Sequence, residues 1–346
     1  MGLSVAMITP WGKNVRCGIR TYSEKLVNAL AKLGVDIYIV RWPRFGARTP
    51  ELVESMVLDK IPVDQIALVH VQHEYGLFSP NLEASFFKAL KSFGKPIVTT
   101  MHAVGNWEVD RIIAEASDRV MVHNEFCFKR FGYPEKTVII EHGCEPKECP
   151  PADECKRSLG IDPRIPIVGY QGFISSYKGL ETLIEAMTKV PNAALLIGGG
   201  WHVEAETDYI MRLKRWSLET LKGRCQWLGY VEDERLPTVY GAMSIVVYPS
   251  RYISESGALL MALSHGKAVI ASNLPPTREK AMLGALMTFK SVEDLRRKIR
   301  RLLKDEALRR GLEEDAKAYA ESVSWPKVAE KHLRLYEEIL NRRVTI

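Results

Sequence analysis

The sequence predicts two doubly wound α/β domains, each built on a parallel sheet that helices cover on both faces. Three observations predict this fold class. Short apolar runs alternate with stretches of helical period, the alternation occurs twice, and a proline-rich segment at 146–166 separates the two series. The length of 346 residues also suits two domains, since one domain usually takes about 150 residues.

The first series predicts a domain over residues 1–145. Between its first two strands, residues 21–33 have a helical pattern whose apolar face includes Tyr22, Leu26 and Leu30. Gly34 then follows, as is typical of a helix end. The strands are expected at 3–8, 35–40, 68–72, 97–102, 119–123 and 137–142.

The second series predicts a similar domain over 167–323, after a linker at 146–166. Its strands are expected at 167–172, 193–197, 225–230, 244–248, 268–271 and 286–289. Its helices are expected at 179–189, 205–221, 234–240, 257–265 and 292–304. Ser324 is a candidate cap for a last helix at 324–346, which is expected to cross back to the first domain. Doubly wound sheets bind ligands at the carboxyl ends of their strands, so the expected ligand site is a cleft between the two sheets.

Composition excludes several protein classes. The chain is 46% hydrophobic and 26% charged, which is typical of a globular protein. No apolar run reaches the roughly 18 residues of a membrane span, and the N-terminal run lacks the basic start of a signal peptide, so we expect a cytoplasmic location. Six cysteines are too few for a disulfide scaffold of this size. The net charge of +6 favours an anionic ligand without requiring nucleic acid, and we expect no nucleic-acid partner.

Lys178 follows the first strand of the second domain and lies at the start of a predicted helix, in the segment 170–179. An ammonium group beside the positive end of a helix suits a phosphate or diphosphate. The alternative is a solvated lysine at a helix start.

The segment 248–262 repeats this arrangement after the fourth strand of the second domain. Ser256 and Gly257 would expose backbone N–H groups to an anion, and Arg251 would add a charge-assisted contact. Glu255 in the same turn would accept hydrogen bonds from sugar hydroxyls. The alternative is a capped core helix beside a surface arginine. Two helix starts suited to a phosphate or diphosphate are less easily accidental in one domain than a single one.

Polar residues also follow strands of the first domain. His102 ends the fourth strand, where an imidazole can bond a sugar hydroxyl or a phosphate. His73, Glu74 and Tyr75 follow the third strand and are candidates for an acceptor site, although a simple turn explains them nearly as well. The loop 41–48 carries three arginines and two aromatic residues, which suits an anionic acceptor or a peripheral contact with the inner face of a membrane. The alternative is an exposed loop whose aromatic side chains pack back.

Three longer stretches of the second domain resemble the retaining glycosyltransferases of family four, which have the GT-B fold. They are Gly172-Phe-Ile-Ser-Ser-Tyr-Lys178-Gly179, Trp227-Leu-Gly-Tyr-Val-Glu-Asp-Glu and Ser256-Gly257-Ala-Leu-Leu-Met-Ala-Leu-Ser-His-Gly266. Looser matches in the first domain are Cys17-Gly18-Ile-Arg20, Val71-Gln-His73-Glu74-Tyr75 and Thr100-Met-His102, and Ser324-Trp325 matches near the end. The resemblance therefore covers nearly the whole chain.

The resemblance implies a nucleotide-sugar donor in the second domain and an acceptor in the first. The donor would contact Gly18 from the first domain and Gly172, Lys178, Tyr230, Val231, Arg251, Glu255, Ser256 and Gly257 from the second. The catalytic groups would be His102, Lys178 and Arg251, and the acceptor would meet Arg20, His73, Glu74 and Tyr75. The expected donors carry uridine or guanosine diphosphate, and the expected acceptor is a sugar or lipid-linked hydroxyl.

The sequence departs from the usual family pattern at several positions. Phe173 stands where many members have an arginine. Ile253 and Met261 stand where many members have a pair of glutamates. The chain instead resembles a variant subgroup with Gln-Ser-Gly at the loop, so that Glu255 takes the place of the glutamine.

No Asp-x-Asp occurs in the sequence, so nothing in it calls for a metal-bridged diphosphate, and no cofactor is expected. Three other functions stay open. A nicotinamide-dependent oxidoreductase would need Gly-x-Gly-x-x-Gly after its first strand, which residues 11–18 do not provide. The others are a nucleotide-sugar epimerase and a catalytically degenerate subunit that binds a sugar nucleotide, which the missing glutamates leave open.

Overall fold

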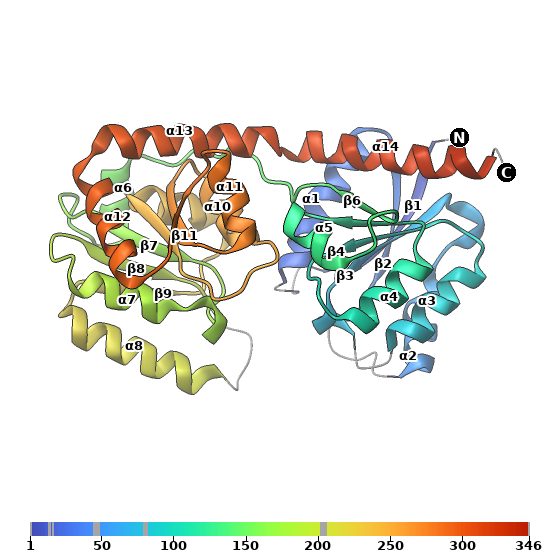
Figure 1. Cartoon of the computed structure of the whole chain (residues 1–346), viewed down its shortest axis with the longest axis horizontal. Coiled ribbons are helices and arrows are strands. Elements are labelled where there is room, and N and C mark those ends of the chain that lie inside the picture. Colours follow the sequence, from blue (N-terminus) through green and yellow to red (C-terminus); the bar gives the residue numbers. More distant parts are fainter. Residues whose placement is uncertain are drawn as a thin grey trace. The chain divides into compact units, whose positions relative to one another are not determined.

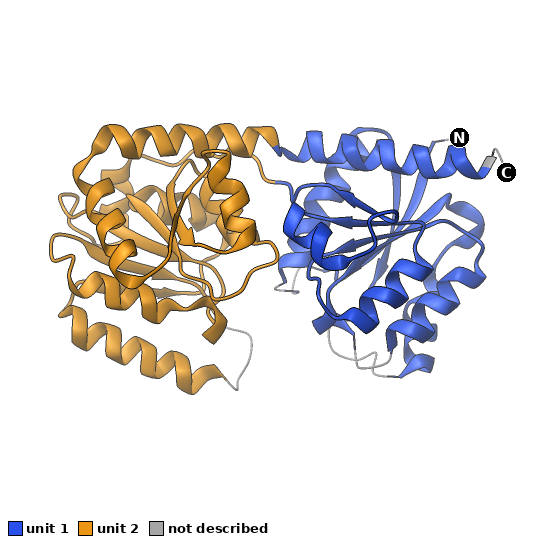
Figure 2. Cartoon of the chain, in the orientation of Figure 1, with its two compact units in different colours: residues 1–143, 323–346 blue, residues 144–322 orange. Residues whose placement is uncertain are grey.

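The computed structural model describes residues 2–12, 15, 17–43, 49–78, 82–200 and 206–344. The chain forms two compact units (Figure 2). Unit 1 consists of residues 1–143 and 323–346, and unit 2 consists of residues 144–322. Each unit holds a six-stranded parallel sheet (Figure 1), so the predicted pair of doubly wound domains is confirmed.

The sheet of unit 1 has the strand order β2-β1-β3-β4-β5-β6. The strands are β1 (Ser4–Thr9), β2 (Asp36–Arg41), β3 (Leu68–His73), β4 (Ile97–Met101), β5 (Arg119–Val122) and β6 (Thr137–Ile139). The helices are α1 (Gly18–Lys32), α2 (Pro50–Met56), α3 (Leu82–Ser92), α4 (Trp107–Ala116), α5 (Glu125–Phe131) and α14 (Trp325–Val344). The order reverses direction at β1 and β3, which is the kind of point where open α/β sheets bind ligands.

Two hydrophobic cores cover the opposite faces of this sheet. Along β1, Ala6 and Ile8 belong to one core, whereas Val5 and Met7 belong to the other. Successive side chains of a strand point to opposite faces, so a strand buried on both sides needs an unbroken apolar run. The second core also takes buried side chains from α14, which packs against α1.

The sheet of unit 2 has the order β12-β11-β10-β7-β8-β9. The strands are β7 (Ile167–Gln171), β8 (Ala194–Gly198), β9 (Cys225–Gly229), β10 (Ile245–Tyr248), β11 (Ala268–Ser272) and β12 (Met287–Phe289). The helices are α6 (Ala152–Ser158), α7 (Leu180–Thr188), α8 (Thr207–Leu221), α9 (Leu236–Ala242), α10 (Gly257–Ser264), α11 (Pro275–Met282), α12 (Val292–Lys304) and α13 (Glu306–Ser322). This is the strand order of dinucleotide-binding folds, with its switch point between β7 and β10.

The segment 146–166 differs from the linker that the sequence predicts. It lies within unit 2 and contains helix α6, which packs against α9. Pro151 occupies the position just before this helix, where no hydrogen bond of the helix needs its missing N–H. A proline that is typical of a helix end therefore stands at a helix start. Cys155 is buried, and a side chain at Gly241 would collide with its sulfur.

Among the helices that the structure describes, none is both long and apolar enough to cross a membrane.

Candidate functional site

The loops that carry Lys178 and Arg251 lie at the switch point of unit 2. The first loop follows β7 and the second follows β10, and these two strands are neighbours in the sheet. Both loops therefore leave the carboxyl edge of the sheet side by side. The backbone N–H of Arg251 donates to the carbonyl of Tyr177 at 2.8 Å, which joins the two loops directly.

Gly179 allows this close approach. It has a left-handed φ of 64°, and a Cβ atom there would lie 2.4 Å from the carbonyl oxygen of Pro249. No side chain fits at that distance, so the glycine is required by the contact as well as by its φ angle. Lys178 is thereby held at the start of α7, within one residue of the contact between the loops.

Four polar side chains that the sequence analysis did not single out fix these loops. The Arg251 guanidinium lies 3.4 Å from the Glu181 carboxylate, which also accepts a 2.7 Å hydrogen bond from the Tyr209 hydroxyl. The Glu206 carboxylate accepts from the Ser176 hydroxyl at 2.9 Å. In the sequence, only the polarity of these residues could have indicated such contacts, and polar residues are equally typical of a solvated helix face.

A second pair of glycines brings the end of β8 to the same place. A Cβ atom at Gly199 would lie 1.8 Å from the carbonyl oxygen of Gly172, and one at Gly172 would lie 3.0 Å from the Cβ of Ala258 in α10. The ends of β7 and β8 and the first turn of α10 thus meet with almost no side chain between them. Backbone packing of this kind is what a diphosphate needs in order to approach main-chain N–H groups.

Glu255 differs from its expected role as an acceptor for sugar hydroxyls. Its carboxylate is buried, 2.7 Å from the Lys280 ammonium of α11, and it accepts a 2.9 Å hydrogen bond from the Ser256 N–H. The Ser256 hydroxyl caps α10 by accepting from Leu259. The Ser256 amide is thus already engaged, and the start of the helix offers Gly257, which is exposed. Lys280 lies 25 residues from Glu255, so no local pattern could have indicated the pair.

Tyr230 and Val231 directly follow β9, beside the other loops of this edge. Val231 is buried, whereas Tyr230 is half-buried with its ring centroid 6.3 Å from that of Phe173. Tyr230 and Phe173 thus form a partly exposed aromatic surface at this edge of the sheet.

In unit 1, the predicted glycine loop leads into α1. Gly18 is the first residue of the helix and is exposed. Arg20, two residues further on, forms a 2.9 Å ion pair with Glu24 and is half-buried. Both residues lie at the carboxyl edge of the sheet of unit 1, because α1 follows β1.

Three histidines from neighbouring strand ends gather around Tyr22. His102, His123 and His142 follow β4, β5 and β6, and their ring centroids lie 4.8, 5.4 and 4.9 Å from that of Tyr22. Among the residues that the structure describes, no group of histidine, cysteine and acidic side chains is arranged to hold a metal ion. Burial, together with His123 and the other nearby histidines, holds the pKa of His102 well below its ordinary value. The sequence analysis gave a role only to His102, because a strand-end histidine is a weak signal until its neighbours are known.

His73 is not placed to contact an acceptor. It ends β3 on the face opposite to Gln72, where its ring stacks on Phe78 at 4.7 Å and is fully buried. Neither ring nitrogen has a hydrogen-bond partner among the described residues. The sequence predicted an acceptor contact for His73, but the side chain is buried. The reason is that successive residues of a strand point to opposite sides of the sheet.

Glu74 and Tyr75 are half-buried in the turn after β3. The Glu74 carboxylate accepts from the Gly76 N–H at 2.8 Å, and the Tyr75 hydroxyl donates to Asp110. These bonds shape a turn, which is the alternative that the sequence left open. Both residues keep part of their surface exposed.

The buried His73 makes the stability of the protein sensitive to acid. Burial lowers the pKa of His73 from 6.5 to about 3. A histidine whose pKa is lower in the folded protein leaves the free energy of unfolding unchanged above pH 6.5. As the pH falls below 6.5, the unfolded chain binds a proton that the folded protein does not bind, so the free energy of unfolding decreases. We expect the loss of unfolding free energy between about pH 7.5 and pH 5 to be about 2 kcal/mol smaller in His73→Leu than in the parent. Urea titrations at both pH values measure this difference, and equal losses in both proteins would contradict it.

The loop 41–48 is only partly described, since residues 44–48 lie outside the described residues. Trp42 is buried, stacks on Phe78 at 4.2 Å and donates to the Leu77 carbonyl at 2.8 Å. This aromatic residue therefore packs back into the core and is not available for a membrane contact.

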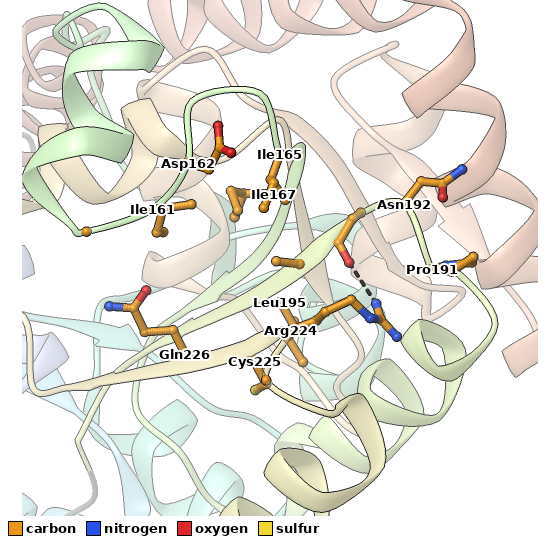
Figure 3. Close-up of a pocket in the computed structure, with 14 residues that line it drawn as sticks. Ile161, Asp162, Ile165, Ile167, Pro191, Asn192, Leu195, Arg224, Cys225 and Gln226 are labelled. Atoms are coloured by element: carbon orange, nitrogen blue, oxygen red, sulfur yellow. Dashed lines mark hydrogen bonds between the residues drawn. The ribbon is translucent and has the colours of Figure 1, made fainter.

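A cavity of about 350 Å³ lies at the opposite, amino edge of the sheet of unit 2 (Figure 3). Its lining includes Ile161, Ile167, Leu195 and Cys225, and Arg224 closes one side by donating to backbone carbonyls. The cavity is mostly apolar and lies at the wrong end of the strands for the predicted nucleotide site.

Comparison with known proteins identifies the family. Residues 152–319, which include the loops of Lys178 and Arg251 and the whole of α10, match the family described as glycosyl transferases group 1. This segment of the chain belongs to the group 1 glycosyltransferases. The resemblance stated from the sequence is thereby confirmed, and the oxidoreductase and epimerase alternatives lose their support.

Relatives of this glycosyltransferase are distant. It is 24% identical to an uncharacterized glycosyltransferase of Methanocaldococcus jannaschii over 90% of this chain and 77% of that one. It is 29% identical to a D-inositol 3-phosphate glycosyltransferase of Corynebacterium jeikeium over 54% of this chain, and the match spans about half of that relative, 47%. The solved structure of Anabaena HepE in complex with UDP and glucose has a TM-score of 0.76 and 17% identity, and the likeness covers 97% of this chain and 100% of that one. At this identity the likeness concerns the fold alone, and it confirms the GT-B fold.

Proposed function

We propose that this glycosyltransferase moves a sugar from a nucleotide diphosphate sugar to a hydroxyl acceptor, with retention of configuration and without a metal ion. The observation that carries the proposal is the joining of the Lys178 and Arg251 loops at the switch point of unit 2, beside the exposed Gly257 at the start of α10. Two cationic side chains and a helix start at one place suit a pyrophosphate.

Departure of the nucleoside diphosphate places negative charge on the β-phosphate. Lys178, Arg251 and the N–H groups at the start of α10 would stabilise that charge more strongly as it develops, which accelerates the reaction. Glu181 holds the Arg251 guanidinium by a 3.4 Å contact that a phosphate can replace. For His102 we propose a contact with the transferred sugar or the donor phosphate.

The donor that we favour carries uridine diphosphate, since the structurally similar HepE binds UDP and glucose. Guanosine diphosphate is the alternative. For the acceptor we propose a sugar or lipid-linked hydroxyl, held in unit 1 near Arg20, Glu74 and Tyr75. A lipid-linked acceptor would bring the protein to the membrane surface as a peripheral contact.

Calorimetry with UDP, GDP and NADH tests the class of ligand. We expect UDP to bind with micromolar affinity in the presence of a chelator, and NADH not to bind. A transfer assay followed by NMR of the anomeric proton then tests retention of configuration. Binding of NADH alone, or nucleotide binding only after a divalent metal is added, would contradict the proposal.

A further inference from the structure

One carboxylate oxygen joins three elements at the carboxyl edge of the sheet of unit 2. Oε1 of Glu181, in the first turn of α7, accepts a 2.7 Å hydrogen bond from the Tyr209 hydroxyl of α8. The same oxygen lies 3.4 Å from the guanidinium of Arg251, which follows β10. Helices α7 and α8 pack against each other (Figure 1), so Tyr209 and Glu181 meet where the two helices are in contact.

The two contacts of this oxygen differ in strength. A charge-assisted hydrogen bond from nitrogen is about 2.7–2.9 Å long, so the 3.4 Å contact of Arg251 is a loose ion pair. Burial, together with the hydrogen bond to Glu181, raises the pKa of Tyr209 above its ordinary value, so its hydroxyl keeps the proton that it donates. Glu181 is therefore bound firmly to Tyr209 and loosely to Arg251.

Exposure shows which member of the ion pair can move. The Arg251 side chain is 60% exposed, whereas the Glu181 side chain is 32% exposed. The second oxygen of Glu181, Oε2, is buried and accepts no hydrogen bond in the part of the chain that the structure describes. Glu181 thus stays in place beside Tyr209, while the Arg251 guanidinium can turn toward a ligand.

Glu181 and a diphosphate compete for the positive charge of Arg251. Both present anionic oxygens to the same guanidinium, and a carboxylate 3.4 Å away offsets its charge even where the guanidinium does not move. Lys178 differs, since its ammonium lies 4.5 Å from the Tyr177 ring centroid and forms no ion pair within the described ranges. Of the two cations at this edge, Arg251 is therefore the one whose availability depends on a neighbouring acid.

We propose that Glu181 is a positioning residue that competes with a bound diphosphate for Arg251 and re-forms its ion pair when the diphosphate leaves. Tyr209 keeps this pair loose by occupying the shared oxygen. The inference rests on the proposed function, in which the diphosphate belongs to the sugar donor before transfer and to the released nucleotide afterwards. Glu181 thereby limits the affinity for the product, and release of product sets the turnover of many enzymes.

Calorimetry with UDP and with inorganic pyrophosphate tests this competition. In Glu181→Gln we expect both ligands to bind about fivefold more tightly than in the parent, the upper range for a partly exposed ion pair. Inhibition of a transfer assay by UDP should strengthen by the same factor. Glu185→Gln is the matched control with unchanged affinities, since Glu185 is an exposed glutamate one turn further along α7. Equal or weaker binding in Glu181→Gln, as a purely structural role would give, would overturn the proposal.

A double-mutant cycle shows whether the gain in affinity passes through Arg251. When Arg251→Ala is already present, Glu181→Gln should change either affinity by less than about twofold, because the guanidinium for which it competes is gone. A fivefold gain that persists without Arg251 would show general repulsion of the ligand and would overturn the proposal.

Tyr209→Phe should have the opposite effect to Glu181→Gln. Without the hydroxyl, Oε1 of Glu181 is left to Arg251 alone, so the ion pair tightens and both ligands should bind about two- to fivefold more weakly. Unchanged or tighter binding in Tyr209→Phe would overturn the role given to Tyr209.

Pyrophosphate separates this inference from the proposed function, because it carries neither base nor sugar. A parent protein that binds pyrophosphate but neither UDP nor GDP would contradict the proposed function, and the pyrophosphate affinities of the variants would still decide the role of Glu181. A parent protein that binds neither pyrophosphate nor a nucleotide would contradict both.

Discussion

Replacing Lys178 by alanine is expected to weaken UDP binding about 10- to 100-fold. A hydrogen bond between a charged side chain and a phosphate contributes about 1.5–3 kcal/mol, and each 1.4 kcal/mol is about tenfold in affinity. Lys178 is half-buried, and its ammonium lies 4.5 Å from the Tyr177 ring centroid, so removing it leaves no buried group without a partner. The affinity for UDP should therefore fall while the protein still folds.

Calorimetry of UDP with the parent and with Lys178→Ala measures the effect. Arg251→Ala should weaken binding by a similar factor, and the double variant need not show the sum, because the two loops are in contact. Lys214→Ala is the matched control, since Lys214 is an exposed lysine on α8. Equal UDP affinities in the parent and Lys178→Ala would show that the diphosphate lies elsewhere.

Replacing Lys280 by methionine is expected to lower the free energy of unfolding by about 3–5 kcal/mol, because it leaves the buried Glu255 carboxylate without its cation. Both side chains are 6% exposed and lie 2.7 Å apart. Glu255 also accepts from the Ser256 N–H at the start of α10, so the same change should weaken UDP binding.

Denaturant titration measures this loss of unfolding free energy, and two further variants test its cause. Lys280→Met combined with Glu255→Gln removes both charges and should recover most of the lost stability. Lys331→Met breaks an ion pair with Glu141 in which both side chains are about 40% exposed, and should cost at most about 1 kcal/mol. A double variant as unstable as Lys280→Met would show that packing, and not an unpaired charge, causes the loss.

Much of the fold could be predicted because its signals are local. The apolar runs of the strands and the period of helices such as α1 and α12 depend on neighbouring residues, and all twelve predicted strands are present. The glycine and lysine of the β7 loop and the serine and glycine before α10 also form short patterns. Helix α6 escaped prediction because the prolines just before it are typical of linkers as well as of helix starts.

Pairings between distant residues could not be predicted. His73 and His102 both follow strands of one sheet, yet one is buried beneath Phe78 and the other lies in a cluster around Tyr22. The order of residues along each strand sets which face a side chain occupies, but only the packed structure shows what covers that face. The same holds for Glu255 and Lys280, which meet because α11 packs beside the start of α10.

The sequence by itself determined the class of the fold, the family and the position of Lys178 at the carboxyl end of β7, because each depends on contiguous residues. Only the tertiary structure decided which polar groups meet: the buried partner of Glu255, the contact between the Lys178 and Arg251 loops, and the cluster of three histidines around Tyr22. The physical reason is that a side chain buried far from water takes its charge, tautomer and partners from whichever elements fold against it, and those elements come from distant parts of the chain.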